Sequence, residues 1–356
     1  MAIESTTEKR FEEDIESFLL SPQGGYTHTT DVYDPAAGLY VGTLIGFIKA
    51  TQPREWVRFE GMCQSDPVKK FCLAFNNACD TDGLICVLRH GFKHRGITFR
   101  VCYFKPESHL NKTAYALYEQ NICNVVRQWH YSAQNNKSVD MVLVFNGIPL
   151  FALELKNQYT GQTVDNAKQQ WMYDRDPREL CFQFDKRILA YFCVDHTDVF
   201  MATRLNKGDT YFLPFNQGSN GAGNDGGKGN PLNPDGYPTA YLWEQVLQKD
   251  SALDIVQKFI HRKDGKTLIF PRFHQLDVVR KLIADVRANG TGVNYLIQHS
   301  AGSGKSNSIA WTAYRLASLH DEWNKPVFAS VIIVTDRTVL EIAMSITPEM
   351  GHAIRT

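Results

Sequence analysis

Residues 139–156 read VDMVLVFNGIPLFALELK, and this stretch decides the fold of the first half of the chain. Apolar residues fill 141–145 and 150–153, and the Asn146-Gly147 pair between them is a strong turn signal. The pattern predicts a β-hairpin with one strand over residues 139–145 and a return strand over 150–156. Asp140 and Glu154 should lie at the same end of this hairpin, and Lys156 should share the face of Glu154 because side chains alternate along a strand.

The turn decides whether the two acidic side chains meet. A two-residue loop would pair Asp140 with Leu153 and direct the two acids to opposite faces of the sheet. An odd-length loop with Gly147 in the left-handed conformation would place Asp140 across from Ala152, diagonal to Glu154. We therefore expect an odd-length turn with a bulge if these residues form a site.

Asp140, Glu154 and Lys156 fit the chemistry of a metal-dependent nuclease. Two carboxylates hold one or two Mg²⁺ ions, which activate a water molecule and stabilise charge on a phosphodiester. A lysine orients the attacking water or helps to deprotonate it, and it offsets charge on phosphorus. Asp-x13-Glu-x-Lys alone is also typical of a hairpin with charged ends. Here the charges interrupt a strand that reads as buried, where they are costly unless paired or metal-bound.

A second element follows in the segment Gln169-Gln170-Trp171-Met172-Tyr173. If this segment is helical, Gln169 and Tyr173 lie one turn apart on one face. We expect that face to border the metal site.

Composition indicates a globular chain of about two domains. The 356 residues are 43% apolar and 12% aromatic, which is ample for packed cores. Lys plus Arg equals Asp plus Glu at 38 each, so any contact with DNA must come from local patches. The eight cysteines all precede residue 200 and form no C-x-x-C pair, as expected for reduced, buried thiols. No basic, apolar leader and no run of about 18 apolar residues occurs, so we expect a cytoplasmic protein with no membrane partner.

The order of patterns along the chain predicts two α/β units and a connector. Residues 8–20 form an amphipathic helix with Thr6 or Thr7 as its cap, and strand signals follow at 97–104, 141–145, 150–155 and 188–193. Residues 1–213 are therefore assigned to one mixed α/β domain. Residues 214–240 are rich in glycine and asparagine and form a loop or linker. Residues 241–356 begin a second α/β unit, with helix signals at 241–247 and 253–260 and strand signals at 293–298 and 331–335.

The second unit carries a phosphate loop in residues 298–306, which read QHSAGSGKS. His299 replaces the first glycine of the G-x-x-x-x-G-K-[ST] pattern, but Gly304-Lys305-Ser306 is intact. We expect a strand over 293–297 to lead into the loop and a helix over 307–317 to follow it, with the amides of 302–305 around a phosphate. A glycine- and serine-rich turn between a strand and a helix is the alternative.

Individual residues of the loop have separate expected roles. Lys305 would reach the β and γ phosphates of a nucleotide, and the Ser306 hydroxyl would bind Mg²⁺. Gln275 lies about 30 residues before the loop, a separation at which a glutamine can contact adenine in helicase-like motors. The expected nucleotide site comprises Gln275, Gly302, Ser303, Gly304, Lys305 and Ser306.

With both sites located, the chain resembles the restriction subunit, or R subunit, of type I restriction-modification enzymes. The likeness covers nearly the whole chain and keeps the order of nuclease, glycine-rich connector and superfamily 2 motor. It rests on the following segments: Glu8-x-x-Phe11-Glu12, 118–121 with Gln128, Asp140 and 146–150, Glu154-Leu155-Lys156-Asn157, Gln169-x-x-x-Tyr173, 212–216, 241–244, 275–277, 299–306 and Thr335-Asp336-Arg337.

The resemblance implies a restriction-endonuclease-like nuclease domain followed by a partial RecA-like motor domain. By this likeness Asp140, Glu154 and Lys156 are the PD-(D/E)xK residues, and Gln169 and Tyr173 are the accompanying Q-x-x-x-Y element. Val139 replaces the proline of the nuclease signature, a position that shapes the strand and carries no chemistry. The acidic Walker B box and the second motor lobe are not found in the chain, so we expect an N-terminal fragment that is not ATPase-competent alone.

The function expected from this reading is ATP-dependent DNA translocation coupled to Mg²⁺-dependent double-strand cleavage of unmodified DNA. The resemblance implies methyltransferase and specificity subunits as partners, with S-adenosylmethionine used by the partner complex and not bound by this chain. A repair helicase-nuclease that acts alone is the alternative with the same chemistry. A catalytically silent interaction module is the alternative of a different class.

Overall fold

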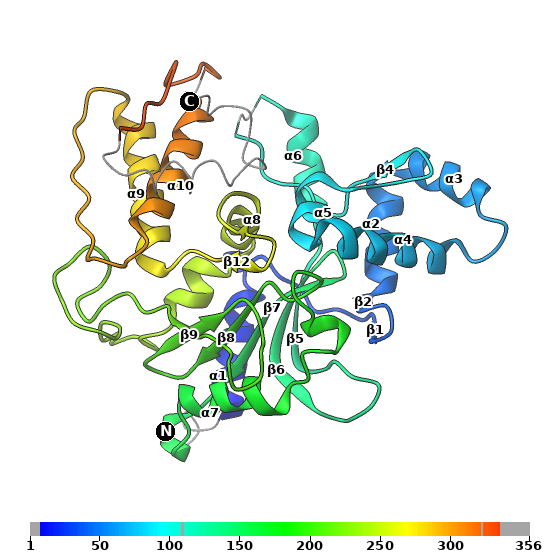
Figure 1. Ribbon diagram of the computed structural model, residues 1–356, viewed down its shortest axis with the longest axis horizontal. Coiled ribbons are helices and arrows are strands. Elements are labelled where there is room, and N and C mark those ends of the chain that lie inside the picture. The colour runs from blue at the N-terminus through cyan, green and yellow to red at the C-terminus, as the bar shows by residue number, and fades with distance from the viewer. Residues whose placement is uncertain (1–7, 108–109, 322, 335–356) are drawn as a thin grey trace.

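A six-stranded mixed sheet forms the centre of the molecule, in the order β10-β9-β8-β7-β6-β5 (Figure 1). The computed structural model describes residues 8–107, 110–321 and 323–334. β7 and β8 run parallel, and the other neighbouring strands run antiparallel. The expected α/β class and mixed sheet are confirmed. The strands are β5 (Cys123–His130), β6 (Ser138–Phe145), β7 (Ile148–Leu155), β8 (Ala190–Val194), β9 (Val199–Ala202) and β10 (Leu213–Pro214).

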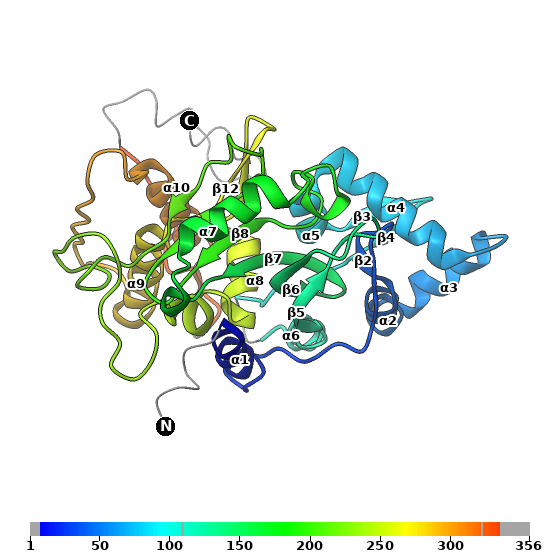
Figure 2. The ribbon, with the colours of Figure 1, turned by 90° about the horizontal axis from the view of Figure 1, so that it is seen from below.

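Helices cover both faces of the sheet. α1 (Glu8–Leu19) buries Phe11 and Ile15 in a cluster on one face, as its helical spacing predicts. α7 (Val164–Gln169) and the following π-helix η3 (Gln170–Asp174) bury Val164 and Trp171 on the other face. Figure 2 shows α1 and α7 on opposite sides of the strands. The threonine cap expected for α1 lies outside the described residues.

A helical lobe projects from the sheet on the side of β5, as Figure 1 shows. Its core is aromatic, with Phe59, Phe71 and Phe99 in mutual ring contact. Only residues 97–99 of the strand expected over 97–104 are in a strand. The lobe and its base comprise β1 (Tyr33–Asp34), β2 (Leu39–Tyr40), α2 (Val41–Thr51), α3 (Pro53–Met62), α4 (Pro67–Asp82), α5 (Leu84–His90), β3 (Phe92–His94) and β4 (Ile97–Phe99).

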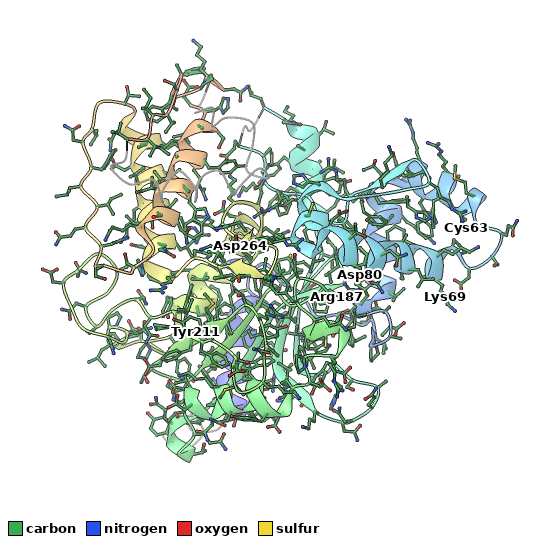
Figure 3. All side chains as sticks on the ribbon, in the orientation of Figure 1. Cys63, Lys69, Asp80, Arg187, Tyr211 and Asp264 are labelled. Carbon is green, nitrogen blue, oxygen red and sulfur yellow. The ribbon has the colours of Figure 1, made fainter. Side chains whose placement is uncertain are left out.

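Arg187 joins this lobe to the sheet, and Figure 3 shows its position between the two. The fully buried guanidinium donates to the carbonyl oxygens of Gly38 and Ala37, at 2.7 Å each, and to the side chain of Asn76. Its charge is thus satisfied by oxygens of the lobe.

No single helix in the described ranges is long and apolar enough to span a membrane. Helices α4 and α5 meet that test only as a pair, and the pair is bent by 113°.

The chain after residue 214 packs against the same core. Residues 215–240 form an irregular connector, as the glycine-rich composition predicts. Phe270 contacts the rings of Phe151 and Phe192 on the sheet, so one hydrophobic cluster includes both parts. The domain boundaries at 213/214 and 240/241 stay predictions.

The remaining helices and strands of the described chain are α6 (Lys112–Glu119), η2 (Gln158–Thr160), η4 (Leu180–Phe182), η5 (Leu242–Val246), α8 (Lys249–Lys258), β11 (His261–Lys263), β12 (Thr267–Ile269), α9 (Phe273–Asn289) and α10 (Lys305–Ala317).

The two strands expected around the phosphate loop are not formed. Residues 293–298 have an irregular backbone, and Leu296 is 93% exposed. A buried parallel strand needs hydrogen-bonding neighbours, and this segment pairs with none of the described strands. Residues 331–334 are likewise irregular, and Thr335-Asp336-Arg337 lies outside the described residues. The prediction of strands here was wrong, and the RecA-like domain stays a prediction.

Candidate active site

The turn between β6 and β7 differs from the expected one. Asn146 and Gly147 form a two-residue turn, with φ values of 51° and 80°. Both residues thus adopt the left-handed backbone that a tight hairpin of this length requires. The positive φ of Gly147 is confirmed, but the odd-length turn was wrong.

A bulge within β7 brings the two acids to one face instead. The register shifts between Leu143 and Val144, which leaves Leu150 as an extra residue of β7. Such an insertion moves every later residue of the strand to the opposite face. Continuing the shifted register by one pair places Glu154 across from Asp140. The two carboxylates therefore share the face that α7 covers.

Asp140 is fixed by the return strand. Its Oδ2 atom accepts a hydrogen bond from the backbone N–H of Leu155 at 2.7 Å and lies 3.5 Å from Nζ of Lys156. The side chain is mostly buried, with 12% of its surface exposed. Asp140 thus presents a carboxylate of defined orientation at the end of the hairpin.

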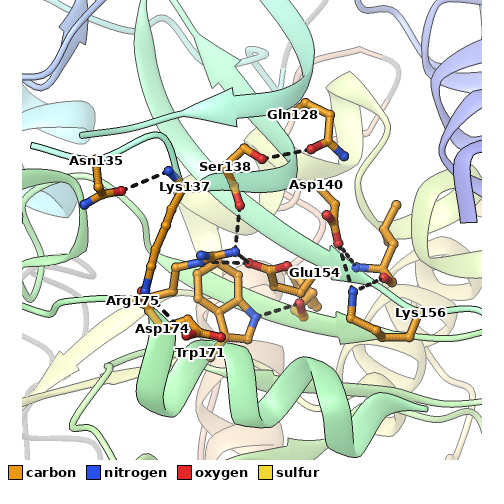
Figure 4. A network of polar contacts seen from close by, with 12 residues as sticks. Gln128, Asn135, Lys137, Ser138, Asp140, Glu154, Lys156, Trp171, Asp174 and Arg175 are labelled. Atoms are coloured by element: carbon orange, nitrogen blue, oxygen red, sulfur yellow. Dashed lines mark hydrogen bonds and ion pairs between the residues drawn. The ribbon is translucent and has the colours of Figure 1, made fainter. Parts of the chain in front are cut away.

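Glu154 is fully buried and paired with Arg175. Its Oε1 atom accepts from both Nε (2.9 Å) and Nη2 (2.5 Å) of Arg175, while Oε2 has no hydrogen-bond partner among the described residues. Burial and the charge of Asp140 raise the pKa of Glu154 well above its usual value. Figure 4 shows Glu154 between Arg175 on one side and Asp140 with Lys156 on the other.

Lys156 links the hairpin to the first helix. Its Nζ atom donates to the carbonyl of Leu155 at 2.6 Å and to Oε1 of Glu8 at 2.8 Å. Burial lowers the pKa of Lys156, but the charges of Asp140 and Glu8 outweigh it, and the pKa lies above its usual value. The protonated amine suits the role of orienting groups and offsetting charge better than that of a base.

A second acidic residue of α1 lies close to this group. Glu12 is 4% exposed and accepts from Arg127 (3.1 Å) and Gln128 (2.8 Å) of β5. Burial raises the pKa of Glu12 above its usual value, and the charge of Asp140 adds to this effect. The site thus includes residues from α1, β5, β6 and β7.

The Q-x-x-x-Y residues border the site as expected. Gln169 ends α7 and Tyr173 lies in η3, with 66% of its surface exposed. Both residues and Lys156 line a cavity of about 380 Å³, which opens to solvent on the α7 side of the hairpin. Its walls are formed by Lys156, Gln162, Asn166, Gln169, Gln170, Tyr173 and Asp174.

The donor atoms at this site fit Mg²⁺. The carboxylate of Asp140 and the unpartnered Oε2 of Glu154 are the hard oxygen ligands that this ion prefers. In the described part of the chain, no group of three or more His, Cys, Asp or Glu side chains is arranged to hold a metal ion. Two carboxylates suffice for Mg²⁺, because this ion keeps several waters and takes phosphate oxygens of a substrate as further ligands.

Three charged residues that contact or adjoin this site, Glu8, Glu12 and Arg175, were not assigned to it by the sequence prediction. Glu8 and Glu12 were part of the family likeness, and their spacing on one helix face was the signal that both point the same way. Arg175 follows the Q-x-x-x-Y element, and nothing in its sequence context marks it. Only the fold shows that it reaches Glu154.

The phosphate loop precedes a helix, as expected. α10 begins at Lys305, and Gly302 and Gly304 have φ values of 74° and 82°. The amides of Lys305 and Ser306 are in the first turn of α10, where backbone N–H groups lack acceptors within the helix. Nζ of Lys305 donates to the carbonyls of His299 (2.9 Å) and Ser300 (3.0 Å). The lysine ammonium therefore lies against the backbone of the loop that precedes α10.

Gln275 contacts the loop directly. This residue, 3% exposed, lies in the first turn of α9, and its Nε2 atom donates to the carbonyls of Ser303 (3.2 Å) and Gly304 (2.8 Å). Its Oε1 atom accepts from the backbone N–H of Arg272 at 2.9 Å. Gln275 also lines a cavity of about 470 Å³ between the β9–β10 end of the sheet and the phosphate loop. The glutamine thus connects the start of α9 to the loop at the edge of this cavity.

The carboxylate site lies in the part of the chain that matches a known protein family. Residues 103–215 match the family model described as "Type I restriction enzyme R protein N terminus". The chain is also 26% identical over 235 residues to a protein named "Putative type I restriction enzyme MjaVIIIP endonuclease subunit" from Methanocaldococcus jannaschii. That alignment covers 63% of this chain and 21% of the relative.

The matched residues include Asp140, Glu154, Lys156, Gln169 and Tyr173, whereas α1 and the phosphate loop lie outside residues 103–215. Both matches agree with the likeness to the R subunit that the sequence indicated. Through the residues that build its carboxylate site, the chain is similar to the N-terminal region of the R protein of type I restriction enzymes.

Proposed function

We propose that this chain supplies the nuclease and phosphate-loop parts of a type I restriction R subunit. Such a subunit would couple ATP-dependent translocation along DNA to Mg²⁺-dependent cleavage of both strands of unmodified DNA. The observation that carries the proposal is the convergence of Asp140, Glu154 and Lys156 on one sheet face, within the residues that match the R protein family.

In cleavage, Asp140 and Glu154 would hold Mg²⁺, the former through its mostly buried carboxylate and the latter through Oε2. When bound, the ion lowers the pKa of a water molecule and stabilises negative charge on the phosphodiester. Lys156, anchored by Glu8 and Leu155, would place its ammonium beside the scissile phosphate and offset charge as it develops. Gln169 and Tyr173, on the wall of the adjoining cavity, would contact the DNA backbone.

In the motor, the first-turn amides of α10 and the Lys305 ammonium would bind the phosphates of ATP. Lys305 would exchange the carbonyls of His299 and Ser300 for phosphate oxygens, and Ser306 would bind the Mg²⁺ that accompanies the nucleotide. Gln275 lines the adjoining cavity, which has room for a nucleoside. The chain spans about a fifth of the length of the relative that it matches, so turnover of ATP would involve the rest of such a protein.

Partners follow from the same proposal. A type I enzyme recognises DNA through a specificity subunit, and a methyltransferase subunit uses S-adenosylmethionine outside this chain. Double-stranded DNA would reach the carboxylate site only within that assembly. This dependence distinguishes the proposal from a repair helicase-nuclease that acts at DNA ends alone.

The test is DNA cleavage by the complete R subunit, with and without the methyltransferase and specificity subunits. We expect cleavage of unmodified circular DNA that requires ATP, Mg²⁺ and both partners. ATP-dependent degradation of linear DNA from its ends by the R subunit alone would contradict the proposal and support the repair enzyme.

A further inference from the structure

Arg175 approaches the carboxylate site from outside the nuclease motif. It lies just after η3, and its side chain is almost fully buried, with 6% of the residue exposed. The Cζ atom lies 5.6 Å from the ring centre of Tyr131 and 5.9 Å from that of Trp171. The position of the guanidinium is therefore set by packing as well as by hydrogen bonds.

Hydrogen bonds fix the rotation of the same group. Nη2 donates to the carbonyl oxygen of Ser138 at 2.6 Å and to Oε1 of Glu154 at 2.5 Å. Nε donates to the same Oε1 atom at 2.9 Å. Ser138 begins β6, two residues before Asp140, so Arg175 connects the strands that carry the two acids.

The contact with Glu154 is one-sided. An arginine and a carboxylate commonly pair through two parallel hydrogen bonds, one to each oxygen. Here both bonds end on Oε1, and Oε2 is buried without a partner in the part of the chain that the structure describes. A buried carboxylate oxygen with no donor is costly unless another cation completes it. The arrangement thus holds one oxygen firmly and leaves the second available to a ligand.

We propose that Arg175 is the positioning residue of the metal site, which holds Glu154 through Oε1 so that Oε2 is directed to a divalent cation shared with Asp140. This inference rests on the proposed nuclease function and deepens it. Residues that orient a metal ligand through a hydrogen bond commonly change metal affinity by about 10- to 100-fold when they are replaced. Arg175 would not touch the substrate or the metal itself.

The competing possibility is an ion pair that blocks the site. If Arg175 only neutralised Glu154, a cation would have to displace it, and removal of the arginine would strengthen metal binding. Positioning predicts the opposite sign, because Glu154 without its two donors loses the orientation of both oxygens. Metal affinity therefore separates the two roles without any measurement of cleavage.

The experiment measures Mn²⁺ binding to the whole chain by calorimetry, for the wild type and for Arg175→Ala, Arg175→Met and Arg175→Lys. We expect Mn²⁺ to bind about 10- to 100-fold more weakly to the alanine and methionine variants. The lysine variant should lie between them and the wild type, since it keeps the charge with one donor atom. Low concentrations of guanidinium should restore affinity to Arg175→Ala, which has a cavity of the right shape, and not to Arg175→Met.

Arg178→Ala is the matched control, because Arg178 is three residues away, its side chain is 86% exposed, and the carboxylate it pairs with is that of Asp176, outside the site. It should bind Mn²⁺ like the wild type. Circular dichroism verifies folding, and Arg175→Met preserves the stacking contacts if Arg175→Ala is unstable. Equal or tighter Mn²⁺ binding by a folded Arg175 variant would overturn the role of Arg175 but would leave the proposed function intact. Absence of Mn²⁺ binding by the wild type would overturn the proposed function and this inference with it.

Discussion

Glu154 shares a sheet face with Asp140 because one extra residue, Leu150, interrupts the pairing of β7 with β6. The two-residue turn at Asn146-Gly147 would by itself direct the two acids to opposite faces. The bulge reverses that outcome four residues before Glu154. Its position near the site agrees with the general use of bulges to redirect functional side chains.

The turn itself should be sensitive to substitution. A Cβ atom at Gly147 would lie 2.4 Å from the carbonyl oxygen of Tyr40 and 2.8 Å from the backbone nitrogen of Leu44, in addition to the cost of its positive φ. We expect Gly147→Ala to lower the free energy of unfolding by more than ~2 kcal/mol. Gly96 occupies the corresponding place in the β3–β4 hairpin, with a similar φ and open space around it, so Gly96→Ala should cost ~1 kcal/mol. Equal losses in urea unfolding would contradict this assignment.

The nuclease and motor sites should be separable. Asp140→Ala, Glu154→Ala or Lys156→Ala in the complete R subunit should abolish cleavage in the assembled complex, because each removes a group of the carboxylate site. ATP hydrolysis should persist, since none of these residues contacts the phosphate loop. Parallel assays of supercoiled DNA cleavage and phosphate release measure both activities. Loss of ATP hydrolysis in folded variants would show that the sites are not independent.

Lys305→Ala tests the phosphate loop. Loss of the ammonium beside His299 and Ser300 should abolish translocation by the complete subunit, and with it the cleavage that translocation triggers. Mn²⁺ binding at the carboxylate site should stay unchanged. Displacement of a triplex from DNA measures translocation directly. Unchanged ATP-dependent cleavage by this variant would mean that the motor has been misplaced.

The cysteines give a prediction with a pH dependence. No disulfide joins the eight thiols, and six of them are buried, whereas Cys63 and Cys86 are partly exposed. Burial raises the pKa of Cys72 to about 11 and that of Cys79 to about 12, so their thiolate fraction at pH 8 is small. Since the thiolate is the reactive form, iodoacetamide at pH 8 should modify Cys63 and Cys86 first and the buried six only on unfolding. Mass spectrometry of the native protein checks this, and rapid labelling of all eight would contradict the packing.

Much of the carboxylate site was predictable because short patterns determine it. Two apolar runs with a turn signal give the β6–β7 hairpin, and helical spacing gives the α1 and α7 faces. The bulge at Leu150 was not predictable, because an insertion in a ladder is decided by how both strands pack on their covering layers. Arg175 and Glu8 were likewise out of reach, since their partners lie 21 and 148 residues away along the chain.

The phosphate loop shows the limit of local patterns. The sequence 298–306 predicted that a helix follows the loop, and α10 does follow it, although it begins at Lys305 and not at 307. The apolar run before it reads as a strand, but a strand exists only with neighbours to pair with. Among the described residues this run pairs with no strand, and its backbone is irregular. An apolar run therefore forms a strand only where another strand pairs with it, whereas the start of a helix depends on local residues.

The most direct test of the account is calorimetric titration of the chain with Mn²⁺, comparing the wild type with Asp140→Asn and Glu154→Gln. Both substitutions preserve shape and remove one carboxylate each. We predict that the wild type binds the ion and that either variant binds it at least ~10-fold more weakly, because each acid supplies a ligand. Absence of binding by the wild type, or unchanged binding by both folded variants, would contradict the assignment of Asp140 and Glu154 as the metal site.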